Sequence, residues 1–181
     1  MPTIKNVSFI SEQDQRAPNG DAVQRLIARF PYKDYGITDD KGDAIVVTMP
    51  GDMRIRMPRK TVEYYSKVAG GDVQAKEDYS PMMHKITAAA SSKDGRERAS
   101  RLKEIVRHFA PMEFKPEKYS FMAYVLGRPN LTVEQARSLH AAYADENPDG
   151  LPADERQVYD MAVDYALAYY KFLIGMLTVI D

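Results

Sequence analysis

The pattern of apolar residues along the chain changes near its middle. Residues 44–49 (AIVVTM) are apolar and mostly β-branched, and residues 52–57 alternate between Met or Ile and Arg. With Pro50-Gly51 as the turn between them, these two runs predict an antiparallel hairpin with one buried and one exposed face. Apolar residues at helical spacing predict helices over 21–30 and 59–68, and residues 7–10 fit a brief strand.

After a polar stretch at 72–80 the pattern is purely helical. Helices are predicted over 81–90, 94–109, 116–126, 132–144 and from Pro152 to the end, and Thr132 and Gln135 fit a capping box. We therefore expect an α+β fold. A small antiparallel hairpin or sheet with helices would form an N-terminal part (1–79), and a mainly α-helical part (80–181) would follow, the two also being compatible with one compact domain.

Composition narrows the class of protein. The 181 residues include 25 basic and 26 acidic residues, so the net charge of −1 excludes a uniformly basic nucleic-acid coat. The absence of cysteine excludes disulfide scaffolds, cysteine-ligated zinc and cysteine nucleophiles. The first 20 residues contain no apolar run of the kind that a secretory signal needs, so we expect a cytoplasmic protein.

The last predicted helix is unusually apolar. Residues 162–180 are long enough to span a membrane, but Asp164 and Lys171 interrupt the run and basic flanks are missing, so we expect a buried helix and no membrane partner. Its end (FLIGMLTVI) has to be covered, because large exposed apolar patches are rare on monomers. Either the chain's own fold or a second copy, in a homo-oligomer, would cover it.

Charge is segregated within the helical part. Residues 84–128 contain ten basic and five acidic side chains, whereas residues 129–181 contain three basic and nine acidic ones. Two interpretations stay open: the segments pack together and neutralise each other, or they form separate patches that attract partners of opposite charge.

Cations and tyrosines supply the candidate partner-binding residues. Two basic clusters lie on the predicted hairpin and on the helix at 94–109, and tyrosines are interleaved with charges at 30–35. Solvated helix faces and ordinary core packing are the alternatives for the same residues. The candidates are Arg54, Arg56, Arg59, Lys60, Arg96, Lys103, Arg107, Tyr32 and Tyr35.

The acidic segment holds weak candidates for metal or acid–base chemistry. Asp145, Asn147 and Asp149, followed by Gly150, resemble the first half of an EF-hand calcium loop. The resemblance stops at Arg156, where such a loop has a bidentate glutamate, so a turn between two helices is the simpler interpretation. Asp160 and Asp164, one helical turn apart, are a further carboxylate pair. No nucleotide-binding or nucleophile motif occurs, and we expect no cofactor.

These observations favour a non-catalytic macromolecule-binding module, an adaptor or an inhibitor, that occupies the surface of a partner protein. One alternative is a nucleic-acid-binding protein that uses the basic hairpin and basic helix. The other is a metal-dependent or acid–base enzyme that uses the acidic C-terminal segment.

Overall fold

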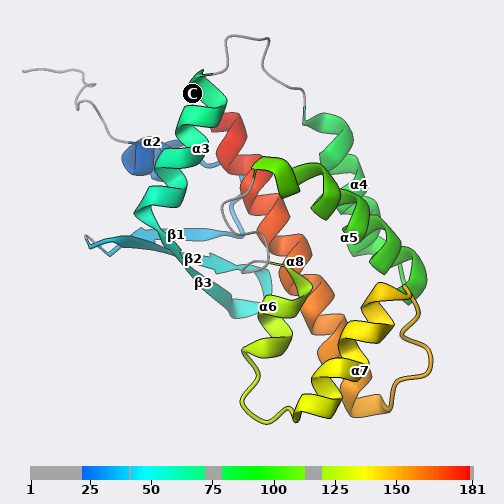
Figure 1. The fold of residues 1–181 in the computed structure, drawn as a ribbon. Helices are drawn as coiled ribbons and strands as arrows, with labels where there is room; N and C mark the ends of the chain where they lie inside the picture. The colour runs from blue at the N-terminus through cyan, green and yellow to red at the C-terminus, as the bar shows by residue number, and fades with distance from the viewer. Residues whose placement is uncertain (1–21, 41, 72–78, 113–119, 180–181) are drawn as a thin grey trace, which may run out of the picture. The chain divides into compact units, whose positions relative to one another are not determined.

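The computed structural model describes residues 22–40, 42–71, 79–112 and 120–179 (Figure 1). Over these residues the chain forms seven α-helices and a three-stranded antiparallel sheet, and its last helix is the longest, which confirms the α+β fold. The strand predicted at residues 7–10 and the polar stretch at 72–78 lie outside the described residues.

The elements follow one another in an order close to the predicted one. The N-terminal elements are α2 (Ala22–Arg29), β1 (Gly36–Asp39), β2 (Ala44–Met49), the 3₁₀ turn η1 (Pro50–Asp52), β3 (Met53–Pro58) and α3 (Arg59–Gly71). The later elements are α4 (Ser80–Ser91), α5 (Gly95–Phe109), the 3₁₀ turn η2 (Ala110–Met112), α6 (Phe121–Leu126), α7 (Val133–Ala144) and α8 (Ala153–Val179).

The described residues pack into two units, each with its own contacts. The sheet unit comprises those between 22 and 71 together with 175–179, and the helical unit comprises those between 79 and 174. Helix α8 therefore contributes its first 22 residues to the helical unit, whereas its last turn, from Gly175, packs with the sheet unit.

The sheet has one buried and one exposed face, as the alternation predicts. Its strand order is β1-β2-β3, and in the register of β2 and β3 Val47 lies opposite Ile55, both buried. Arg54 and Arg56 point to the other face and are exposed. Helices α2 and α3 pack on the buried face (Figure 1), so the hairpin's apolar side forms the core of this unit.

Strand β1 lies where the sequence pattern predicts no element, between the helix at 21–30 and the hairpin that begins at residue 44. The strand is only four residues long, Gly-Ile-Thr-Asp, and lies at the edge of the sheet, where it pairs with β2. Its one large apolar residue, Ile37, lies opposite Val47. Glycine and aspartate are poor strand residues, so this strand forms because it pairs with β2 and not because of its own strand propensity.

The apolar end of α8 is covered within the described chain. Phe172, Leu173, Ile174, Met176 and Leu177 are all buried. Gly175 permits this packing, since a Cβ atom there would stand 2.7 Å from Phe30 Cε1 and 2.9 Å from Tyr32 Cε2. Among the described helices α8 alone has the length and composition to cross a membrane, and 72% of its most apolar stretch is buried inside the protein.

Aromatic stacking joins the helices of the helical unit. Phe121 of α6 stacks on Tyr143 of α7 at 4.3 Å between ring centroids and meets Tyr159 of α8 edge-on at 5.0 Å. Phe109 of α5 stacks on Tyr170 at 5.8 Å. Helix α8 thus packs against both α5 and α6 along its buried face.

Side-chain caps fix where two helices of this unit begin. At α5, Asp94 accepts a hydrogen bond from the Arg96 amide at 3.0 Å. At α7, the predicted capping box is present, with Thr132 and Gln135 each bonding the other's backbone amide. Helix α6 begins at Phe121, later than the predicted start at 116, and residues 113–119 are not described.

Candidate partner-binding surfaces

The basic cluster of the hairpin is partly engaged within the sheet unit. Arg56 pairs with Asp40 at 2.8 Å, and Arg59 pairs with Asp39 and donates to the Gly42 carbonyl at 3.1 Å. Arg54 and Lys60 are exposed, and neither forms an ion pair with any residue that the structure describes. Two of the four predicted cations thus bind the β1–β2 connection.

Asp40 organises that connection. Its carboxylate accepts a hydrogen bond from the Gly42 amide at 3.0 Å, which closes a tight turn before β2. This hydrogen bond, followed by the attraction of Arg56, lowers the pKa of Asp40 below its ordinary value. The ion pair joins the otherwise exposed Arg56 side chain to the β1–β2 connection.

The two candidate tyrosines form an aromatic cluster with Phe30. The ring of Tyr32 meets Phe30 edge-on at 5.3 Å, and the ring of Tyr35 lies 5.9 Å from that of Tyr32. Tyr35 is only 7% exposed, and burial, then the negative charge of Asp34, raises its pKa strongly. Tyr32 is half-buried and lies against Gly175, so this cluster mainly seats the last turn of α8.

The basic helix α5 is largely neutralised by the acidic segment. Arg96 pairs with Asp149 at 3.1 Å, Lys103 with Glu146 at 3.3 Å, and Arg98 with Asp164. Each pair joins the basic segment (84–128) to the acidic one (129–181). Of the two interpretations that the sequence left open, these pairs favour the one in which the segments pack together and neutralise each other. The third predicted cation of this helix, Arg107, is exposed and forms no ion pair within the described ranges.

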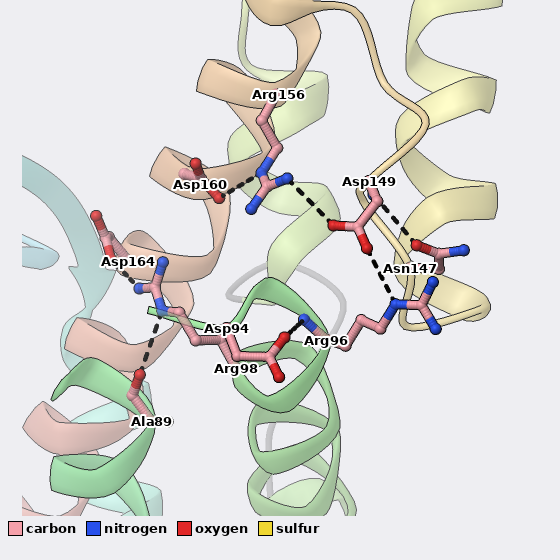
Figure 2. Close-up of polar contacts among 9 residues, drawn as sticks. All are labelled: Ala89, Asp94, Arg96, Arg98, Asn147, Asp149, Arg156, Asp160 and Asp164. Atoms are coloured by element: carbon pink, nitrogen blue, oxygen red, sulfur yellow. Dashed lines mark hydrogen bonds and ion pairs between the residues drawn. The ribbon is translucent and has the colours of Figure 1, made fainter. Parts of the chain in front are cut away.

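The α7–α8 connection contains the weak metal-ligand candidates Asp145, Asn147 and Asp149, and Asp149 forms ion pairs with two arginines. Figure 2 shows Asp149 between Arg96, at 3.1 Å, and Arg156, at 3.6 Å, with one carboxylate oxygen directed to each. Asn147 accepts a hydrogen bond from the Asp149 amide at 3.2 Å, and Asp145 ends α7. The residue at the glutamate position of the EF-hand pattern, Arg156, thus neutralises the loop instead of completing a calcium site.

The carboxylate pair of α8 is also paired with arginines. Asp160 lies 3.2 Å from Arg156, and Asp164 binds Arg98, which also donates to the Ala89 carbonyl at 3.2 Å (Figure 2). Over the described ranges, no three His, Cys, Asp or Glu residues gather in a way that could hold a metal ion. The arrangement is suited to joining α4, α5 and α8 and offers no carboxylate pair converging on an open cleft.

An open apolar groove runs between α6 and α7 in the helical unit, and we call it the α6–α7 groove. It has a volume of about 390 Å³ and its floor and rim combine apolar with basic side chains. Leu126 and Val133, on its two walls, are 71% and 68% exposed, the highest values among the large apolar residues of the described chain. The lining residues are Met122, Leu126, Val133, Ala136, Arg137 and His140.

The sequence pattern does not single out this groove. Residues 133, 136, 137 and 140 share one face of α7, because they follow the i, i+3, i+4, i+7 spacing of a helix. A second apolar stripe on the same helix, with Leu139 and Ala142, is the one that packs inward. With two weak stripes on one helix, only the tertiary structure decides which is buried.

Comparisons with known proteins add no functional assignment: no protein-family model, curated protein or solved structure matches this chain.

Proposed function

We propose that this protein is a non-catalytic binding module, an adaptor or an inhibitor, that occupies the surface of a partner protein through the α6–α7 groove. The observation that carries the proposal is the exposure of Leu126 and Val133 beside each other in one groove. Contiguous exposed apolar side chains on a folded protein are characteristic of interaction sites, whereas scattered ones need no explanation.

The energetics favour a covered groove. Full burial of a leucine or valine side chain is worth about 1.5–3 kcal/mol relative to leaving it in water. Neither Leu126 nor Val133 makes that contribution in the isolated chain, since most of each side chain remains in solvent. A partner that covers both would gain it, which offsets part of the entropy lost on association.

The charge pattern supports the same function by elimination. Arg96, Lys103 and Arg98 are engaged by the acidic segment. The carboxylates that an acid–base enzyme would use, Asp160 and Asp164, are held by arginines. These contacts stabilise the helical unit, and among the described residues the groove holds the two most exposed large apolar side chains.

Site-specific photo-crosslinking in the cells that make the protein tests this proposal. A photoreactive residue is introduced at Leu126 of α6 or at Val133 of α7. The matched control is Ser138, which is exposed on α7 but lies outside the groove. The same partner protein should be captured from both groove positions and not from residue 138. Equal adducts at all three positions, or none from the groove, would contradict the proposal.

A second candidate function, nucleic-acid binding, is favoured by the outer face of the sheet. Arg54 is exposed there, and Lys60 is exposed in the first turn of α3. Neither forms an ion pair among the described residues, and phosphate binding uses such cations. Binding of single- and double-stranded oligonucleotides would be measured at increasing salt. Affinity that falls steeply with salt and is lost in the Arg54→Glu, Lys60→Glu double variant would support it, and no binding at low salt would exclude it.

A further inference from the structure

The chemistry of the α6–α7 groove also specifies its partner, an inference that rests on the proposed function. We propose that the groove accepts an amphipathic helical segment of another protein, apolar where it meets Leu126 and Val133 and acidic where it meets Arg137 and His140. The geometry is that of a helix lying in a groove between two helices.

The apolar side chains line up in the way such a ligand requires. Met122 and Leu126 are four residues apart on α6, and Val133 and Ala136 are three apart on α7, so each wall presents a short stripe along its helix axis. A helical ligand presents apolar residues at the same spacings. Its two or three anchoring side chains would fill the open volume of about 390 Å³.

The polar lining is basic only. Arg137 and His140 line the groove, no acidic side chain does, and both are exposed without an ion pair to any described residue. A second hollow, of about 360 Å³, differs because Asp154 and Glu155 line it together with Arg128. The Arg137 guanidinium therefore has no counter-charge among the described residues, and a carboxylate on the ligand would provide one.

The same charges argue against a second copy of this chain as the occupant. A two-fold dimer is formed by the same patch on both subunits. A dimer through this groove would place Arg137 of both copies in one interface, whose lining residues include no carboxylate. Like charges placed opposite each other oppose association. An acidic partner removes this repulsion, whereas self-pairing creates it.

A display library of amphipathic helical peptides provides the test. Apolar positions are fixed at helical spacing, and the flanking positions are randomised among Asp, Glu, Lys and Arg. Binders are selected on the full-length chain and then measured by fluorescence anisotropy against the variants Leu126→Asp, Arg137→Glu and Lys93→Glu. Lys93 is the matched control, because it is exposed, lies outside the groove and undergoes the same charge change.

Selected peptides should be net acidic and should lose at least tenfold in affinity with Leu126→Asp and with Arg137→Glu, but not with Lys93→Glu. If groove-dependent peptides are neutral or basic and insensitive to Arg137→Glu, the acidic partner is wrong while the binding function stands. If no selected peptide depends on Leu126, both proposals fail. A dimer of the unliganded chain that Leu126→Asp dissociates would replace the acidic partner with a second copy.

Discussion

Gly175 of α8 lies directly against the ring of Phe30: a Cβ atom at position 175 would stand 2.7 Å from Phe30 Cε1 and 2.8 Å from Cζ. Rings are rigid, so neither atom can yield without a shift of the helix or of the aromatic cluster. The last turn of α8 and the segment after α2 therefore approach more closely than any side chain would permit.

Substitution of Gly175 by alanine should destabilise the protein in spite of alanine's better helix propensity. Propensity alone would favour Gly175→Ala by about 1 kcal/mol, whereas overpacking of a tight contact costs about 1–3 kcal/mol. We expect a net loss in the free energy of unfolding, measured by urea denaturation. Gly150→Ala is the control, because a Cβ there meets nothing within 4 Å and stability should change by less than about 0.5 kcal/mol. Equal stability of the two variants would contradict the contact.

The ion pair between Arg98 and Asp164 should respond differently to loss of either partner. The Arg98 side chain is 13% exposed, whereas that of Asp164 is 55% exposed. Asp164→Ala leaves a buried guanidinium with only the Ala89 carbonyl, so we expect a loss of about 1–3 kcal/mol. Arg98→Met keeps the apolar stem and leaves a carboxylate that water can solvate, so its cost should be smaller.

Thermal and urea unfolding of both variants and of Arg96→Met would check this order. Arg96 and Asp149 are each more than half exposed, and such a pair contributes about 0–1 kcal/mol. The prediction is wrong if Arg98→Met proves more damaging than Asp164→Ala.

The lowered pKa of Asp40 makes part of the sheet unit's stability depend on pH. A carboxyl whose pKa is lower in the folded than in the unfolded chain stabilises the fold above its unfolded pKa of about 3.9, and this contribution is lost as pH falls through the folded pKa. Arg56→Ala should raise the pKa of Asp40 only part of the way, because the Gly42 amide remains. A carboxyl titration by NMR measures the pKa of Asp40 in the unmodified protein and in the Arg56→Ala variant. An unchanged pKa in the variant would exclude any influence of Arg56.

Loss of the capping box should loosen the beginning of α7, where the groove starts. Thr132→Ala removes the acceptor for the Gln135 amide, bonded at 3.1 Å, and such caps are worth about 1 kcal/mol. We expect that loss in unfolding experiments and faster amide exchange near Val133. Ser138→Ala, an exposed change in mid-helix, should leave both measurements nearly unchanged. Normal exchange at Val133 in the Thr132 variant would show that the cap is dispensable.

Removal of the Tyr159 hydroxyl should be harmless or stabilising. Burial raises the pKa of Tyr159 to about 12, and the hydroxyl has no hydrogen-bond partner among the described residues. An unsatisfied buried polar group is unfavourable, so Tyr159→Phe should maintain or raise the melting temperature. In the control Tyr124→Phe, a hydroxyl bonded to Met161 Sδ at 3.6 Å is lost and no gain is expected. A lower melting temperature for Tyr159→Phe would reveal a partner of that hydroxyl.

The hairpin and most helices follow from the sequence because their signals are local. Alternation of Met and Ile with Arg decides which face of β3 is buried, and Thr132 with Gln135 marks the start of α7. Strand β1 has no such signal, since Gly36–Asp39 becomes a strand through pairing with β2. Ile27 shows the limit of periodicity, because its helical spacing from Val23 would place it on a buried face, yet it is 37% exposed.

The candidate surfaces were less predictable, because engagement of a charge depends on distant residues. Nothing local to Arg96 indicates that Asp149, 53 residues later, will bind it. Likewise, the exposure of Leu126 depends on how α6 packs against α7, which leaves the groove open. Sequence identifies the charged residues but not the pairs they form.

The division of α8 between two units has a consequence for biosynthesis. The core of the sheet unit uses Met176 and Leu177, although its strands and helices are made from residues before 72. A ribosome must therefore synthesise the chain past Leu177 before this unit can close, although the unit's strands and other helices are made more than 100 residues earlier. Until then Phe30 and Tyr32 lack the helical turn that packs against them, so the nascent sheet unit is exposed for longest and most in need of protection from aggregation.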